Sequence, residues 1–186
     1  MEINQNTIIK DDNPIIRQRS NDIPLPISNE DKTLVLDMLK YVKESTDETI
    51  AKEKNLQPAV GISAIQLGIN KKLLAISIIN EKNEVVYEYA LANAKIISNS
   101  IEKTYLKQGE GCLSVPKAHE GYVNRSARIK VKAYDVINDK NIIIKADGYL
   151  SVVLQHEIDH FKGILYYDHI NKTNPLFELP GSIPIE

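Results

Sequence analysis

The order of apolar and polar positions along this chain of 186 residues predicts a helix in its first quarter and several strands in its centre. Residues 31–44 repeat apolar side chains at helical spacing. Ser28, followed by Asp31 three positions later, is a possible capping box for that helix. Short apolar or alternating runs are typical of strands. These strands are expected at residues 73–79, 85–91, 95–98, 129–134 and 142–146.

A second helix is predicted between residues 149 and 161. Asp147 stands at the position of an N-cap, and Gly163 stands where a glycine commonly ends a helix. The helix is apolar on almost every side, so it is expected to be buried. The predicted fold class is α+β, with mostly antiparallel strands packed around this buried helix and with an additional N-terminal helix.

Both ends of the chain contain prolines and are weakly patterned. Pro14, Pro24 and Pro26 favour an extended arm over residues 1–27. Residues 171–186 contain three further prolines and are expected to form a loose tail. The length suits one domain, so residues 1–186 are expected to form a single domain.

Composition argues against several classes of function. The chain has 23 basic and 25 acidic residues and a formal net charge of −2, so no basic excess points to nucleic acid as the main ligand. Its apolar runs, such as residues 73–79, are far shorter than the roughly 18 residues of a membrane span. The polar first residues do not resemble a secretory signal, which makes the cytoplasm the expected location. The single cysteine, Cys112, leaves no partner for an intrachain disulfide.

The predicted buried helix carries the segment His156–His160, His-Glu-Ile-Asp-His. Residues four apart on a helix lie about 40° apart around its axis, so His156 and His160 direct their imidazoles at one point. Glu157 is rotated away from that point, yet it can reach a water molecule there. Two ligands and a base make up the His-Glu-x-x-His pattern of metal-dependent hydrolases.

The alternative for this segment is a chance pair of surface histidines. Its apolar neighbours favour the metal site, since buried polar side chains are costly without partners. Asp159 is expected to orient a histidine ligand or to pair with an arginine. A catalytic metal site also needs a third protein ligand, for which Cys112, His119 and several carboxylates are candidates.

Three segments, read together, resemble the three motifs of the peptide deformylases. Residues 110–114, Glu-Gly-Cys-Leu-Ser, and residues 155–160, Gln-His-Glu-Ile-Asp-His, match the second and third motifs in full. Residues 59–66 are similar to the first motif, Gly-x-Gly-x-Ala-Ala-x-Gln. The resemblance runs from about residue 10 to about residue 175, and it is nearest to the class common in Gram-positive bacteria and mollicutes.

The first motif departs from the family pattern at three positions. Ala59 stands where the family has its first Gly, Ser63 where it has its first Ala, and Ile65 where it often has Pro. Ala and Ser are small, so these changes are expected to preserve close packing. They are expected to alter the shape of the segment that lies along the substrate more than the catalytic chemistry.

The resemblance implies hydrolysis of the formyl group from N-formylmethionine at the start of newly made polypeptides, with release of formate. The implied cofactor is one divalent ion per chain, typically Fe²⁺, which Ni²⁺, Co²⁺ or, less actively, Zn²⁺ replaces. The implied partners are formylmethionyl nascent peptides and, transiently, the ribosome, with no membrane and no sequence-specific nucleic acid. The implied ligands are Cys112, His156 and His160, the implied acid and base is Glu157, and Gln66 with the Leu113 backbone N–H would hold the oxyanion.

The peptide substrate is expected to lie extended along residues 60–62 as an added strand. Arg125 is expected to pair with a buried carboxylate near the site or to be a surface residue. His119 and His169 are expected to lie outside the ligand set. The expected substrate contacts are Gly61, Ile62, Gly111 and Val153, and the expected walls of an apolar methionine pocket are Ile62, Val153 and the region of Ile129.

Two other functions share part of this pattern. A zincin-type metalloprotease has the same helix motif but needs a third ligand downstream of His160, where His169 is available at a poorly fitting spacing. A non-enzymatic relative could keep the metal site as a structural or binding module. Glu157 and Gln66 argue against that second function, since neither residue is needed to hold an ion.

Overall fold

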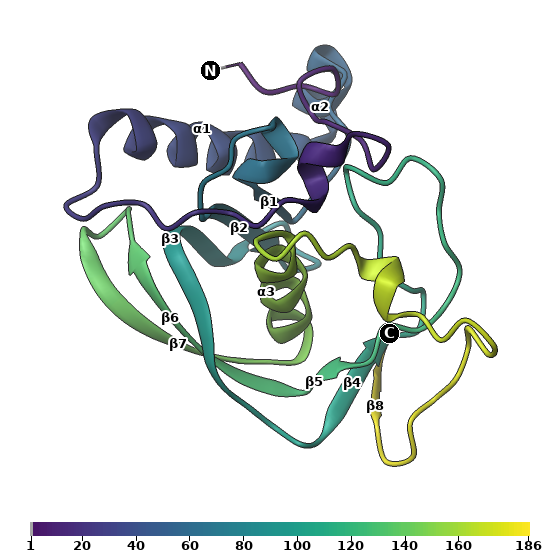
Figure 1. Ribbon diagram of the computed structural model, residues 1–186. Coiled ribbons are helices and arrows are strands. Elements are labelled where there is room, and N and C mark those ends of the chain that lie inside the picture. The colour runs from purple at the N-terminus through teal and green to yellow at the C-terminus, as the bar shows by residue number, and fades with distance from the viewer. Residues whose placement is uncertain (1) are drawn as a thin grey trace.

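The computed structural model describes residues 2–186 and has the α+β architecture drawn in Figure 1. The helices are α1 (Asn29–Ser45), α2 (Glu48–Lys54) and α3 (Gly148–His160), with short 3-10 helices η1 (Pro14–Arg17), η2 (Ala64–Leu67) and η3 (Tyr166–His169). The strands are β1 (Gly61–Ser63), β2 (Leu73–Ile79), β3 (Val85–Asn99), β4 (Lys103–Leu106), β5 (Arg125–Ser126), β6 (Arg128–Asp135), β7 (Lys140–Asp147) and β8 (Ile183–Ile185). The predicted fold class is confirmed.

The strands form two sheets that surround α3 (Figure 1). The larger sheet is antiparallel throughout and has the order β1-β2-β3-β6-β7. The smaller sheet has the order β5-β4-β8, in which β8 runs parallel to β4. In this arrangement β1 is an edge strand of the larger sheet, next to the buried helix.

The continuous apolar run of β2 follows from burial on both faces of the sheet. Leu74 and Ile76 belong to the hydrophobic cluster that contains the apolar residues of α3. Leu73 and Ala75 belong to the cluster that contains the apolar residues of α1. The sheet is therefore sandwiched between the two helices near β1 and β2, which fixes α3 against the strand that carries the first sequence motif.

The first long helix forms where the periodicity predicts it. Ser28 is the N-cap of α1, and its hydroxyl accepts a hydrogen bond of 3.1 Å from the backbone N–H of Asp31. The Asp31 carboxylate pairs with Lys71 instead of returning to the cap, so only one half of the expected capping box is present. The buried residues of α1, among them Met38 and Val42, lie on its sheet-facing side.

The prediction of two separate strands at 85–91 and 95–98 is wrong, because both belong to the single strand β3. Asn93 lies in this strand with a φ of 54°, and the register with β6 shifts beside it. The Asn93 side chain binds the backbone of Ile23 through two hydrogen bonds of 2.9 Å. The bulge at Asn93 thus anchors the N-terminal arm. It also interrupts the alternation of buried and exposed residues along β3, which is why the sequence pattern suggests two strands.

The two ends of the chain are held against the core to different extents. The arm contains η1 and buries Ile3, Ile8, Ile16 and Ile23. The expectation of a loose tail is wrong for its last residues, because β8 pairs with β4. No helix within residues 2–186 is long and apolar enough to cross a membrane.

Candidate active site

The histidine pair lies on the last two turns of α3. Asp147 is the N-cap residue of this helix but makes no side-chain capping hydrogen bond, and Gly163, with a φ of 71°, follows its end. Glu157 and His160 are only 4% and 1% exposed, because α3 is enclosed by strands of both sheets. The predicted buried helix with its polar residues is confirmed.

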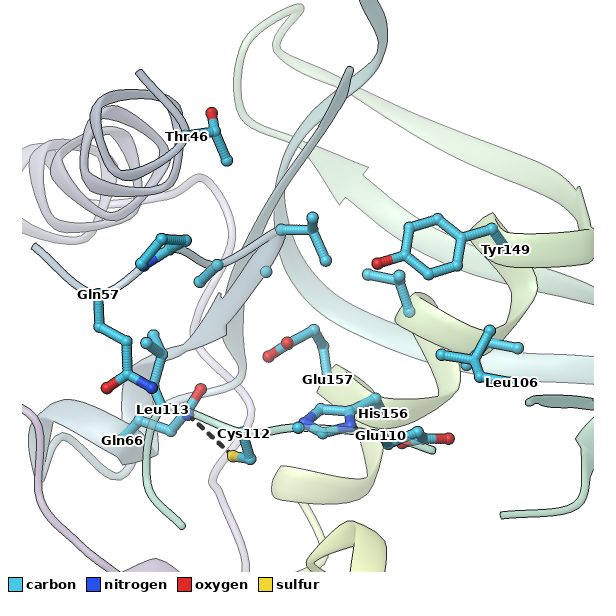
Figure 2. Close-up of a pocket in the computed structure, with 17 residues that line it drawn as sticks. Thr46, Gln57, Gln66, Leu106, Glu110, Cys112, Leu113, Tyr149, His156 and Glu157 are labelled. Atoms are coloured by element: carbon cyan, nitrogen blue, oxygen red, sulfur yellow. Dashed lines mark hydrogen bonds and ion pairs between the residues drawn. The ribbon is translucent and has the colours of Figure 1, made fainter. Parts of the chain in front are cut away.

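Cys112, from the loop that follows β4, joins the two histidines, and Figure 2 shows it beside His156. Its Sγ and one ring nitrogen each of His156 and His160 all lie within 4.8 Å of one another. Ligands bound to one ion at about 2.0–2.3 Å fall within such a range, and a thiolate with two imidazoles is a common donor set for transition metals. These residues therefore fit a metal ion, whereas His119 does not belong to this group.

A buried chain of charges orients the histidines. Glu110 lies 2.8 Å from Nδ1 of His156, which leaves the Nε2 of that ring for the ligand group. Arg125 binds both oxygens of Glu110, at 2.8 and 2.9 Å, and also binds Asp159. Asp159 in turn lies 2.8 Å from Nε2 of His169. Arg125 is thus a buried partner of carboxylates, and Asp159 supports the site without being a ligand.

Burial and the neighbouring charges set the ionisation of this network. Burial would raise the pKa of Glu110, but hydrogen bonds from Arg125 and His156 outweigh it and hold that pKa at about 2. Burial likewise disfavours charge on His156, yet Cys112 and Glu110 raise its pKa well above the usual value. Burial, together with the nearby His156, lowers the pKa of His160 well below the usual value.

Glu157 belongs to α3, and its side chain lies between that helix and β1. Its Oε2 accepts a hydrogen bond of 2.8 Å from the Ser63 hydroxyl, and burial raises the pKa of its carboxyl group. A side-chain carbon added to Gly61 would lie 2.6 Å from the Glu157 Oε1, so only glycine leaves room for this carboxylate. Glu157 therefore depends on the backbone and side chains of β1 for its position.

Gln66 and Leu113 lie on the opposite side of Cys112 from Glu110, the carboxylate that Arg125 binds (Figure 2). The Gln66 Oε1 accepts the N–H of Ser63 at 2.8 Å, which turns its Nε2 toward Cys112 Sγ at 3.5 Å and Ser114 Oγ at 3.3 Å. Among the hydrogen bonds within residues 2–186, none uses the N–H of Leu113. A side-chain amide, held by long hydrogen bonds to Cys112 and Ser114, and the backbone N–H of the residue after Cys112 are thus donors close to that ligand candidate.

A cavity of about 320 Å³ opens onto these residues. The predicted contacts Gly61, Gly111 and Val153 line it, as do the ligand candidates Cys112 and His156. Its full lining is Thr46, Gln57, Pro58, Ala59, Val60, Gly61, Gln66, Leu106, Glu110, Gly111, Cys112, Leu113, Tyr149, Val152, Val153, His156 and Glu157.

The prediction that Ile62 and Ile129 form the pocket walls is wrong. Side chains alternate along a strand, so Gly61 and Ser63 face Glu157 while Ile62 enters the core cluster of α1. Ile129 lies on β6, is 3% exposed and belongs to the hydrophobic cluster that contains the apolar residues of α3. The walls that sequence reasoning missed include Leu106 and Tyr149.

Helical spacing carries a signal for part of this lining. Tyr149, Val152 and Val153 precede His156 by seven, four and three positions, so all of them share one face of α3. Of these three, only Val153 is among the predicted contacts, and the same spacing would also have identified Tyr149 and Val152 as lining residues. Nothing in the sequence pattern indicated Leu106, which comes from β4.

A His-Glu-x-x-His helix, joined by a cysteine from another segment and facing a cavity, is typical of metal-dependent hydrolases. The profile of the polypeptide deformylase family matches residues 5–175 of the chain. Peptide deformylase 2 of Bacillus anthracis is 42% identical over 179 residues, covering 96% of each chain. The peptide deformylase of Oceanobacillus iheyensis is 43% identical over 185 residues, covering 99% of this chain and 100% of its own. The chain belongs to the peptide deformylase family, and the predicted likeness to Gram-positive members is confirmed.

Solved structures agree with this assignment. The probable peptide deformylase of Synechococcus phage S-SSM7 aligns with a TM-score of 0.70 and 30% identity over 87% of this chain and 97% of its own. A class I type b peptide deformylase from Acinetobacter baumannii, bound to Met-Ala-Ser, aligns with a TM-score of 0.70 and 25% identity over 91% of this chain and 100% of its own.

Proposed function

We propose that this chain removes the formyl group from the N-terminal N-formylmethionine of newly made polypeptides and releases formate, acting as one catalytic domain over residues 1–186. The observation that carries the proposal is the meeting of Cys112, His156 and His160 within 4.8 Å, with Glu157 beside them in one cavity. The zincin alternative is weaker, because the third member of the group is an upstream cysteine and His169 is engaged with Asp159.

Each residue at the site has a step in the proposed hydrolysis. When bound by Cys112, His156 and His160, the ion would polarise the formyl carbonyl and make water more acidic. Glu157 accepts a proton from the attacking water and returns it to the amine nitrogen as the carbon–nitrogen bond breaks. The Gln66 amide and the Leu113 N–H donate to the formyl oxygen as its negative charge grows, an interaction typically worth about 2.7–4 kcal/mol per donor.

The peptide is proposed to bind as an extra strand at the free edge of β1. Within residues 2–186, β1 pairs on one side only, with β2, and its Gly61 lines the cavity together with Gly111. The methionine side chain would enter the apolar part of that cavity, between Val153 and Leu106. The Met-Ala-Ser held by the Acinetobacter enzyme has the chemistry of a deformylated product, which supports this substrate class.

The proposed ion is Fe²⁺, with Ni²⁺, Co²⁺ and Zn²⁺ as substitutes. Cys112 is half-buried, and a thiolate beside Fe²⁺ is open to oxidation. The iron-loaded enzyme is therefore proposed to lose activity in air faster than the nickel-loaded enzyme. Equal half-lives in air for the two forms would contradict this part of the proposal.

Nascent chains are the proposed substrate, so the proposed location is the cytoplasm and the proposed partner is the ribosome, contacted transiently. Four exposed lysines on the outer face of the larger sheet support such a contact: Lys95 on β3, Lys130 and Lys132 on β6, and Lys145 on β7. A face of this charge suits the phosphates of ribosomal RNA without reading a base sequence.

The test is formate release from formyl-Met-Ala-Ser by protein purified without oxygen and loaded with Fe²⁺. Glu157→Gln is expected to keep its metal and to lower kcat by at least about 10²-fold, because the general base is lost. Cys112→Ala is expected to lose the metal. Glu81→Gln, at an exposed turn, is the matched control and should behave as the wild type. Full activity of Glu157→Gln would contradict the mechanism, and a folded, iron-loaded wild type without activity would favour a non-enzymatic role.

A further inference from the structure

Ser63 places a hydroxyl group against the general base of the proposed reaction. This residue is 0% exposed, and its Oγ lies 2.8 Å from the Glu157 Oε2 and 2.9 Å from the Glu157 backbone oxygen. The peptide deformylase motif that this segment resembles has Ala at the same position. The hydroxyl is therefore a feature in which this chain departs from the motif, and it touches a residue that acts in catalysis.

Two residues of β1 hold the two oxygens of the carboxylate in different ways. Ser63 binds Oε2 through a hydrogen bond, whereas Oε1 lies 2.6 Å from where a side-chain carbon on Gly61 would be, and Gly61 lines the cavity. The free oxygen is thus the one on the side where the peptide and the water would lie. A glutamate side chain has three rotatable bonds, and a buried hydrogen bond to a charged group restricts them strongly.

The hydroxyl of Ser63 also connects two elements that are far apart in the sequence. Ser63 belongs to the edge strand β1, and Glu157 belongs to α3, 94 residues later. The neighbouring backbone N–H of Ser63 binds the Gln66 Oε1 at 2.8 Å. One residue of β1 therefore contacts both the proposed base and the proposed oxyanion donor, which fixes the two groups relative to each other.

We propose that Ser63 is a positioning residue for deformylation, whose hydroxyl fixes one oxygen of Glu157 so that the other faces the attacking water and the leaving amine. The inference rests on the proposed function. The competing role is purely structural, in which the hydroxyl donates only to the Glu157 backbone oxygen and joins β1 to α3. The two roles differ in their effect on turnover, because a structural bond affects stability and a positioning bond affects kcat.

Ser63→Ala tests the proposal cleanly, because it removes only the hydroxyl and introduces the residue that the family motif has. We expect kcat for formyl-Met-Ala-Ser to fall roughly tenfold, with KM and bound metal unchanged, since small displacements of a catalytic group cost rate. Ser63→Thr keeps the hydroxyl and should restore most of the loss. Ser77→Ala, at a buried serine of β2, is the matched control and should retain wild-type kcat.

A double-mutant cycle separates positioning from other effects. In the Glu157→Gln background, Ser63→Ala should lower the residual rate no further, because the hydroxyl acts through that carboxylate. An unchanged kcat in Ser63→Ala, or an equal loss in both backgrounds, would overturn the inference. If the wild type itself releases no formate, the proposed function fails, whereas an active wild type with an equally active Ser63→Ala variant leaves the function intact and rejects only the role of Ser63.

Discussion

At the scale of single residues, the two histidines of α3 show how neighbouring positions acquire different properties. His156 has a carboxylate partner at 2.8 Å, and its pKa is raised, whereas His160 has no carboxylate hydrogen bond within the described residues, and its pKa is lowered. A metal ligand must present a deprotonated nitrogen. Glu110 fixes which nitrogen of His156 does so, because it occupies Nδ1. The environment of each ring, and not its residue type, thus defines its part in the site.

Tyr41 gives a residue-scale prediction about stability and pH. It is 2% exposed, donates a hydrogen bond of 3.0 Å to the backbone oxygen of Gln57, and has its pKa raised to about 12 by burial. A pKa raised on folding stabilises the protein fully below the unfolded value of about 10, and that stabilisation is lost as the pH rises from there toward 12. Tyr41→Phe should cost about 1 kcal/mol at pH 8, with a smaller difference from wild type at pH 11.

Urea unfolding at the two pH values measures this difference. Tyr87→Phe, at a tyrosine that is 36% exposed, is the matched control for loss of a phenol group. A gap between wild type and Tyr41→Phe that is the same at pH 8 and pH 11 would show that burial of the Tyr41 hydroxyl has no part in alkaline stability.

At the scale of elements, the sequence predicts those whose pattern is regular. Helix α1 and strand β2 are identified correctly because one apolar face or one continuous apolar run defines each of them. Strand β3 is divided in the prediction because the bulge at Asn93 interrupts its period. Strand β8 is missed because its pairing with β4 is long-range and only three residues long.

The site follows the same division between local and long-range information. Helical spacing brings His156 and His160 together, and the resemblance to the deformylase motifs adds Cys112. The hydrogen bond between Ser63 and Glu157 joins two motifs, and neither motif alone predicts it. The direction of Ile62 follows only from the register of β1 against β2, which turns alternate side chains to opposite faces.

The chain of charges that joins β5 to α3 supports an element-scale prediction. Arg125 is 4% exposed and connects Glu110 to Asp159. Arg125→Ala leaves two buried carboxylates without their cation, so the free energy of unfolding should fall by about 3–5 kcal/mol. Arg125→Lys should lose less, because one ammonium group replaces part of the bidentate contact. Metal affinity should fall about 10- to 100-fold as Glu110 loses its orientation.

Chemical unfolding and metal titration of the two Arg125 variants test this prediction. Arg128→Ala removes an arginine that is nearby in sequence, pairs with Glu102 and has a side chain that is 62% exposed. This matched control should change stability by less than about 1 kcal/mol. If Arg125→Ala lowered the free energy of unfolding and the metal affinity no more than Arg128→Ala does, the buried ion pairs would contribute nothing specific to the site.

At the scale of the whole molecule, charge is distributed unevenly despite a net value of only −2. On the outer face of the larger sheet, Lys95 lies opposite Lys132, and Lys130 lies opposite Lys145. Like charges across neighbouring strands destabilise a sheet. None of these four lysines forms an ion pair within residues 2–186. A surface that keeps such pairs without neutralising them suits a polyanionic partner. Under the proposed ribosome contact, the face of the sheet toward α3 would hold the site and the opposite face would bind the ribosome.

This division predicts that docking and chemistry can be separated by mutation. Reversal of two charges, Lys130→Glu with Lys132→Glu, should weaken co-sedimentation with ribosomes and reduce its dependence on salt, because fewer counterions are released from RNA. The kcat/KM for formyl-Met-Ala-Ser should stay at the wild-type value, since neither lysine lines the cavity. Lys32→Glu with Lys52→Glu makes the same change in net charge at exposed positions of α1 and α2, so it controls for charge alone. Equal co-sedimentation of the two double variants would exclude the outer sheet face as the docking surface, whereas a loss confined to Lys130→Glu with Lys132→Glu would assign it that role.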